Sequence, residues 1–111
     1  MIKVYCKEGV YFKFISYEFI TLARIFCRVY EKHDMVPVVT SACDGTHGPG
    51  SLHPDGLGWD WRRWGLKDAQ ATVDEIRNEA QAIDYHYDVV LENDHIHSEY
   101  DLNKQRPTGM A

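Results

Sequence analysis

Apolar residues recur along the chain with two different periods, and these periods predict two helices and five strands. Between Ser16 and Lys32 the apolar side chains return at steps of three and four residues, which is typical of one buried face of a helix. Ser16 stands where an N-cap is expected. A second stripe with the same period predicts a helix over roughly Lys67 to Ile83. The two stripes consist of Phe19, Leu22, Phe26, Val29 and Tyr30, and of Ala69, Val73, Ile76, Ala80 and Ile83.

Strand patterns flank both helices. The stretch MIKVYCKEGVYFKF alternates apolar and charged residues, and MVPVVTSA is a β-branched run in which Pro37 favours a sheet edge or the first residues of a strand. In LGWDWR the two tryptophans face one way and Asp60 faces the other, because successive side chains of a strand point to opposite faces. YDVVLEND and HIHSEY predict two further strands or one bent strand.

The order of these elements is strand, helix, strand, long loop, strand, helix, strand, strand. It predicts an α+β fold with a mostly antiparallel sheet and two helices packed on it. The 111 residues, 44% of them hydrophobic, fit one domain over residues 1–111 with a polar tail from about 103 to 111, and we expect a monomer. The Gly- and Pro-rich run from Asp44 to Gly58 is too long for a tight turn, and loops of that length are often functional.

Composition excludes several classes of protein. A net charge of -5, with no cluster of Lys and Arg, argues against a nucleic-acid partner. Cys6, Cys27 and Cys43 are odd in number and lack C-x-x-C spacing, which argues against a disulfide framework or a cysteine zinc finger. Neither a signal peptide nor a membrane span is visible. We therefore expect synthesis in the cytoplasm, with release or export if the protein acts at the cell wall.

Histidines and acids gather in the two stretches that packing explains least. A catalytic zinc typically takes three protein ligands from His and Asp/Glu and leaves a fourth position open. His53, Asp60 and one histidine of HIH would supply that number, whereas the alternative is a solvated polar cluster. In a strand His95 and His97 project to the same face and Ile96 faces the core. The residues of the two stretches are His47, His53 and Asp60, and Glu92, Asp94, His95, His97 and Glu99.

SLHPDGLGWD resembles the S-x-H-x-x-G-x-A-x-D motif of the superfamily that contains lysostaphin, the D-Ala-D-Ala metallopeptidases and the hedgehog signalling domain. HIH resembles the closing H-x-H of the same superfamily. The matches cover roughly residues 40–62 and 90–100. The resemblance implies the zinc ligands His53, Asp60 and His97, places His95 in the active site and not on the metal, and matches His47 to a histidine near the hedgehog zinc. It also implies a hedgehog-like or D-Ala-D-Ala-peptidase-like form of the α+β fold.

The chain departs from this motif at two points. Gly58 replaces the usual alanine, which keeps a small residue beside the metal. The arginine that many D-Ala-D-Ala peptidases place upstream of the motif is not evident in VVTSACDGTHG, so Arg62 or Arg63 is the candidate to replace it.

The resemblance implies a zinc peptidase that hydrolyses amide bonds of peptidoglycan stem peptides, as a carboxypeptidase or an endopeptidase. Glu92 or Asp94 would be the general base, His95 and His47 would donate hydrogen bonds to the oxyanion, and Glu99 would orient the ring of His97. The alternative is a catalytically inactive zinc-binding domain that binds a partner or belongs to a larger assembly, such as a phage particle.

Overall fold

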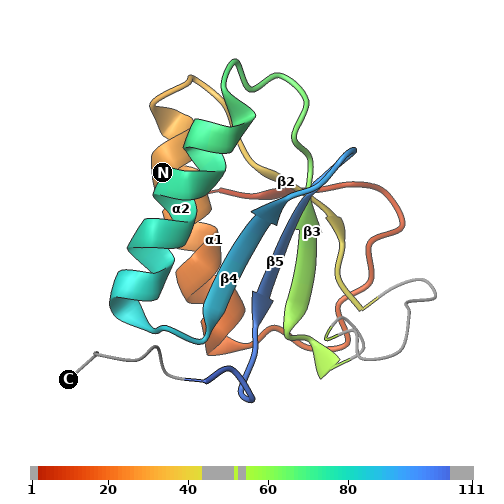
Figure 1. Cartoon of the computed structure of the whole chain (residues 1–111). Helices are drawn as coiled ribbons and strands as arrows, with labels where there is room; N and C mark the ends of the chain where they lie inside the picture. The colour runs from red at the N-terminus through yellow and green to blue at the C-terminus, as the bar shows by residue number, and fades with distance from the viewer. Residues whose placement is uncertain (1–2, 44–51, 53–54, 106–111) are drawn as a thin grey trace.

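The computed structural model describes residues 3–43, 52 and 55–105. These residues form one sheet of five strands and two helices on it, so the prediction of a mostly antiparallel α+β fold is confirmed (Figure 1). The strand order across the sheet is β1-β2-β3-β5-β4, with β1 and β2 parallel and all other neighbours antiparallel. The elements are β1 (Tyr5–Cys6), α1 (Tyr17–Glu31), β2 (Val38–Ser41), β3 (Gly58–Trp61), α2 (Ala69–Ile83), β4 (Tyr87–Leu91) and β5 (Ile96–Tyr100).

Both helices begin at a side-chain cap. The Ser16 hydroxyl accepts a hydrogen bond from the Phe19 amide at 3.1 Å, as the sequence predicts, and satisfies one of the amides that a helix start leaves unpaired. In α2 the Asp68 carboxylate accepts from the Ala71 amide at 3.0 Å. The second helix therefore begins at Ala69, slightly later than the predicted Lys67.

The apolar stripe of α2 is shorter than predicted. Val73, Ile76 and Ala80 are fully buried, but Ile83 in the last turn is 62% exposed. Ile83 lines a surface groove together with Thr21 and other residues of α1, so it faces the outer side of the gap between the helices instead of the sheet. Inclusion of Ile83 in the buried face was wrong, because a helix continues its period beyond the surface that it covers.

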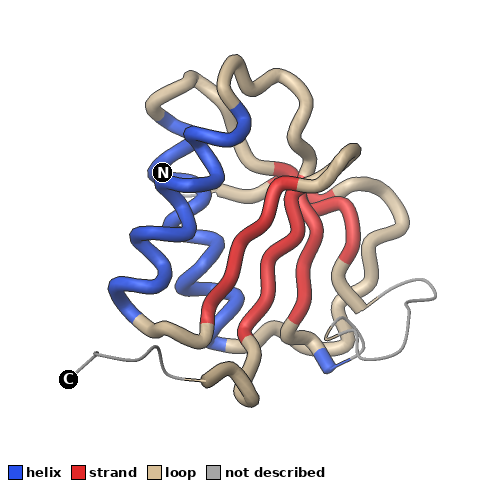
Figure 2. The backbone as a smooth tube through the Cα atoms, viewed as in Figure 1, coloured by secondary structure: helices blue, strands red, loops and turns tan. Residues whose placement is uncertain are grey.

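The core lies between the two helices and one face of the sheet (Figure 2). The ring of Phe26 on α1 stacks on the ring of Trp61 on β3, with centroids 3.9 Å apart. Trp59 and Trp61 are buried, as the alternation of LGWDWR predicts, and Ile96 on β5 is buried beside them. Alternation along each strand then sends the intervening residues to the other face of the sheet.

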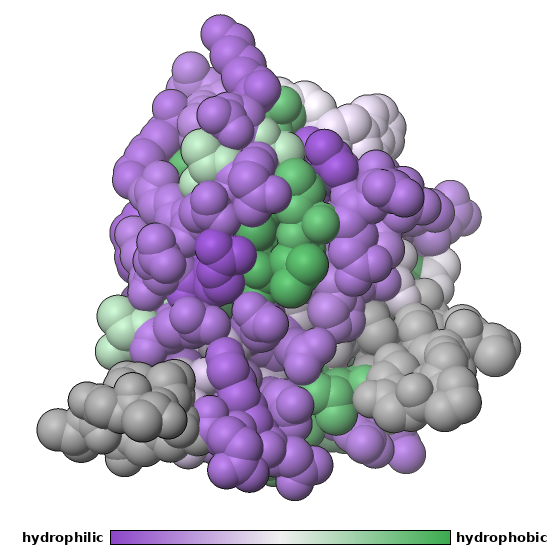
Figure 3. All heavy atoms as spheres, viewed as in Figure 1, coloured by the Kyte–Doolittle hydropathy of each residue, from purple (hydrophilic) through white to green (hydrophobic). Residues whose placement is uncertain are grey.

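That other face carries polar residues, and neither α1 nor α2 covers it. Asp60, His97 and Glu99 lie on it, together with Val90, which is 41% exposed. The view in Figure 3 shows polar residues over most of the visible surface, with smaller apolar areas between them. An antiparallel sheet that packs on the core with one face leaves its other face available for a polar site.

Two further features of the sheet bear on the sequence predictions. Pro37 lies immediately before β2, and its carbonyl accepts a hydrogen bond from the Tyr5 amide at 3.0 Å. β2 itself is internal, because β1 covers its outer side. YDVVLEND and HIHSEY form two strands, β4 and β5, joined by a short turn that contains Glu92, Asp94 and His95.

Neither of the two helices is long and apolar enough to cross a membrane.

Candidate metal centre

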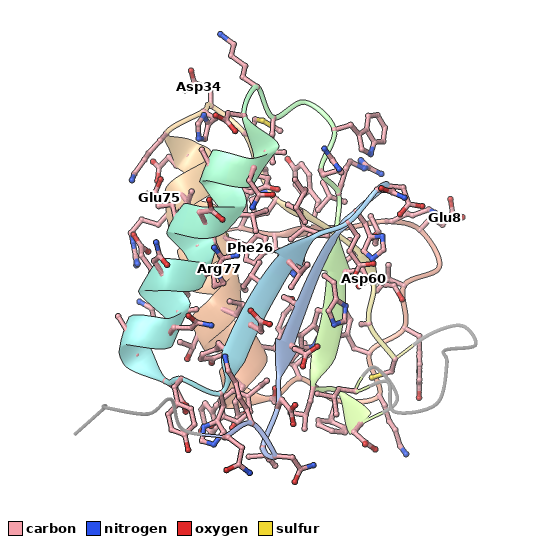
Figure 4. The ribbon with its side chains drawn as sticks, in the orientation of Figure 1. Glu8, Phe26, Asp34, Asp60, Glu75 and Arg77 are labelled. Carbon is pink, nitrogen blue, oxygen red and sulfur yellow. The ribbon has the colours of Figure 1, made fainter. Side chains whose placement is uncertain are left out.

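Pairing of β3 with β5 brings the candidate metal ligands together. Asp60 and His97 are direct cross-strand partners, so their side chains leave the sheet on the same, helix-free face. Figure 4 shows Asp60 on β3, on the side of the strand away from Phe26 and the helices. The two side chains are largely enclosed, with 17% and 21% of their surface exposed.

Both ring nitrogens of His97 face carboxylates. Nδ1 lies 3.0 Å from Oδ1 of Asp60, and Nε2 lies 2.9 Å from Oε1 of Glu99. The hydrogen bond with Asp60, supported by Glu99 and opposed by partial burial, raises the pKa of His97 to about 9. In the absence of a metal, this raised pKa favours the protonated ring of His97 at neutral pH, between the carboxyl groups of Asp60 and Glu99.

His95 lies at the edge of the same cluster, immediately before β5. Its Nε2 is 3.6 Å from Oδ1 of Asp60 and 3.6 Å from Oε2 of Glu92. Its Nδ1 lies 2.6 Å from Oδ1 of Asp94, and this hydrogen bond lowers the pKa of the Asp94 carboxyl. His95 thus has one nitrogen fixed by a carboxylate and the other directed toward Asp60.

The turn that carries these groups is fastened to the end of β3. The Glu92 amide donates to the His95 carbonyl at 2.9 Å, which closes the turn. Nη1 of Arg63 lies 2.6 Å from the Glu92 carbonyl oxygen and 3.3 Å from that of Asn93. Arg63 therefore positions the turn that carries Glu92 and His95.

Asp60, His95 and His97 form a group that can hold a metal ion. One donor atom from each residue lies within 4.8 Å of the donors of the other two. Two imidazole nitrogens and one carboxylate oxygen are a donor set found in catalytic zinc sites, where an open position remains. The second nitrogen of each histidine contacts a carboxylate, Glu99 for His97 and Asp94 for His95, as metal-bound histidines usually do. The residues therefore fit a divalent transition metal such as zinc.

The structure brings together most of the residues that the sequence singled out. Asp60 and His97, two of the three implied ligands, are in contact, and Glu99 lies where a partner for the His97 ring was expected. His95, which the resemblance places in the active site and not on the metal, also belongs to the possible metal-binding group, because its Nε2 lies 3.6 Å from Oδ1 of Asp60. His53 and His47 lie outside the described residues, and the ligand role of the first and the oxyanion role of the second stay predictions.

The two candidates for the general base differ in their surroundings. The Glu92 side chain is 47% exposed and its Oε2 lies 3.6 Å from Nε2 of His95, the nitrogen directed toward Asp60. The Asp94 side chain is 89% exposed, and its Oδ1 lies 2.6 Å from Nδ1, the other nitrogen of the His95 ring. Glu92 is therefore the carboxyl group on the side of Nε2, and Asp94 is the one that contacts Nδ1 of the same ring.

A pocket of about 350 Å³ opens beside the cluster. Sequence reasoning missed three of its residues, Lys7, Thr40 and Trp64, because they come from segments that carry no motif and meet only in the fold. The residues that line it are Lys7, Thr40, Asp60, Arg62, Trp64, Asp94 and His95.

Comparisons of the chain with protein families, curated proteins and solved structures gave no significant match.

Proposed function

We propose that the protein is a zinc-dependent peptidase that hydrolyses amide bonds of peptidoglycan stem peptides. The observation that carries this proposal is the group Asp60, His95 and His97, which lies at a pocket and not in the core. A site built only for structure is usually closed by four protein ligands, whereas this group offers three donors and has the further carboxyl group of Glu92 beside it. The likeness of SLHPDGLGWD and HIH to a peptidase motif supplies the substrate class.

Zinc bound to such a site supplies polarisation of the scissile carbonyl and activation of water at neutral pH. Asp60 and His97 would bind it, together with His53 if the motif holds. Glu92 would accept the proton of the attacking water and return it to the leaving amine. With His53 as the third ligand, the doubly protonated ring of His95 would donate its Nδ1 proton to Asp94 and its Nε2 proton to the oxyanion, and His95 lines the pocket where that oxyanion would lie.

A polar structural cluster without enzymatic activity, with or without bound zinc, is the second candidate, and one observation favours it. Both nitrogens of His97 already have carboxylate partners, so the Asp60, His97 and Glu99 network is satisfied as it stands. A network of this kind can stabilise a sheet without any reaction.

The deciding experiment uses purified, zinc-loaded protein with murein and with synthetic stem peptides that contain D-Ala-D-Ala, L-Ala-D-Glu and cross-bridge amides. We expect new amino groups from at least one substrate, and a rate about 10²–10⁴-fold lower for Glu92→Gln with zinc retained. Glu8→Gln is the matched control, because Glu8 is exposed and lies outside the pocket (Figure 4). Absence of cleavage of every substrate by the wild type would contradict the peptidase and leave the structural cluster without enzymatic activity.

A further inference from the structure

The pocket beside the metal centre carries side chains of both charges in equal number. A ligand with a net charge of either sign would therefore meet like charges as well as unlike ones. A neutral ligand with several hydrogen-bond donors and acceptors meets no such repulsion and can pair with both kinds of group. The charged residues of the pocket are Lys7 and Arg62, and Asp60 and Asp94.

Trp64 supplies the one large apolar surface among the described residues that line this pocket. It is 69% exposed, although tryptophan is usually largely buried. The guanidinium carbon of Arg62 lies 4.3 Å from the centre of the indole ring, and this cation–π contact covers part of the ring and restrains it. The pocket thus combines one aromatic surface, open to solvent, with polar groups around it.

We propose that this pocket binds a neutral sugar ring that stacks on Trp64. A pyranose has an apolar face of C–H groups and a rim of hydroxyl groups. It can pack its apolar face on the indole while its hydroxyls exchange hydrogen bonds with Thr40 and Lys7, which line the same pocket. The pocket volume of about 350 Å³ is small for a ligand site and suits one ring better than a long oligomer.

The source of the sugar rests on the proposed function. Stem peptides of peptidoglycan are attached to a glycan strand, so a sugar ring of that strand would enter the pocket while the peptide lies across the metal group. The substrate class is then a stem peptide that still carries its sugar, and not a free peptide.

Binding can be measured without catalysis and without a peptide. The full chain is titrated with tri-N-acetylchitotriose, with maltotriose, and with N-acetyltyrosine amide, which offers an aromatic ring without the rim of sugar hydroxyls. NMR signals of the Trp64 indole N–H and of the Thr40 and His95 amides follow the pocket. We expect saturable shifts with sugar at millimolar concentrations, because one stacked ring and a few hydrogen bonds give a weak site. Tighter binding of chitotriose than of maltotriose assigns the pocket to N-acetylated sugars, and equal binding assigns it to pyranoses in general.

Two positions assign the binding to its residues. Trp64→Ala should weaken sugar binding about tenfold, whereas Trp64→Phe should recover part of the loss because it restores an aromatic surface. Thr40→Val keeps the shape of the side chain and removes its hydroxyl, so affinity should fall about three- to tenfold. Tyr17→Ala is the control, since Tyr17 is an aromatic residue on α1, 86% exposed and outside this pocket.

Three results would overturn this proposal: neither sugar binds, N-acetyltyrosine amide binds more tightly than both sugars, or Trp64→Ala leaves sugar binding intact. These outcomes are distinguishable from failure of the peptidase. Sugar binding by a protein that cleaves nothing removes the reaction and keeps the binding site. Cleavage of stem peptides by a protein that binds no sugar removes only the binding site.

Discussion

Nδ1 of His97 lies 3.0 Å from Oδ1 of Asp60, although 37 residues separate them in the chain. The contact exists because β3 and β5 are neighbours in the sheet with Asp60 and His97 directly opposite each other. A metal ion bound here would replace the proton that the two residues share, so metal affinity and the protonation of His97 would be coupled.

Zinc affinity should rise with pH until His97 has lost its proton. Because Asp60 raises the pKa of His97 to about 9, metal and proton compete for Nδ1 over the neutral range, and affinity should rise by about tenfold per pH unit below pH 9. Asp60→Asn should lower the pKa of His97 toward its ordinary value of 6.5. NMR titration of the histidine rings and zinc titration at several pH values measure both effects. A pKa of His97 that Asp60→Asn leaves unchanged contradicts the assignment.

The same pair makes the metal-free protein sensitive to alkali. A group whose pKa is higher in the folded state than in the unfolded state stabilises the fold below its unfolded pKa. The contribution of His97 should therefore be complete below about pH 6.5 and disappear as the pH rises through about 9. Urea unfolding of the metal-free protein across this range should show falling stability, and Asp60→Asn should remove most of the slope.

His97 and His95 should differ in their effect on metal and on rate. His97→Ala removes a ligand on the sheet, so zinc should be lost, whereas His95→Ala should retain zinc and lower the rate about 10²–10³-fold. His33→Ala is the control, because His33 is exposed and does not belong to the cluster. Elemental analysis and peptide hydrolysis are the measurements. The reverse pattern would make His95 the ligand, with Glu92 three residues before it.

Arg63 should matter for the site although it lies outside the pocket. Its Nη1 is 2.6 Å from the Glu92 carbonyl, and loss of a hydrogen bond of this kind costs about 0.5–1.5 kcal/mol. Arg63→Gln should increase hydrogen exchange in the turn from Glu92 to His95 and lower the rate while the fold persists. Arg28→Gln, which breaks an exposed pair with Glu79 on the helices, should leave the turn unchanged. Equal hydrogen exchange of this turn in the Arg63→Gln and Arg28→Gln variants would contradict this role of Arg63.

Ser98 should be required for the fold and not for the chemistry. Its hydroxyl is fully buried, donates to the Trp59 carbonyl at 2.8 Å and accepts from Nε1 of Trp61 at 2.8 Å. Ser98→Ala leaves the Trp61 N–H unpaired, so the free energy of unfolding should fall by about 1–3 kcal/mol. Chemical denaturation gives the value. Ser41→Ala, at a partly exposed position of β2, should change stability by less than about 0.5 kcal/mol.

The sequence predicted the elements and the side of the sheet on which the site lies. The stripe from Phe19 to Tyr30 and the alternation of LGWDWR were enough for this, because burial selects apolar residues at the period of each element. The same alternation placed Asp60 on the face of the sheet away from the two tryptophans, and His97 on the face away from Ile96. The exposed Ile83 shows the limit of this reasoning, since periodicity does not tell how far the covering surface extends.

Only the tertiary structure decided which residues meet. β3 lies beside β5 and not beside β4, and β1 lies beside β2, so Asp60 contacts His97 and Lys7 reaches a pocket that also contains Arg62 and His95. It also separated the two arginines, with Arg62 in the pocket and Arg63 on the turn. The physical reason is that hydrophobic periodicity is a local property of a segment. The neighbour that each strand selects depends on packing and hydrogen bonding summed over the whole sheet.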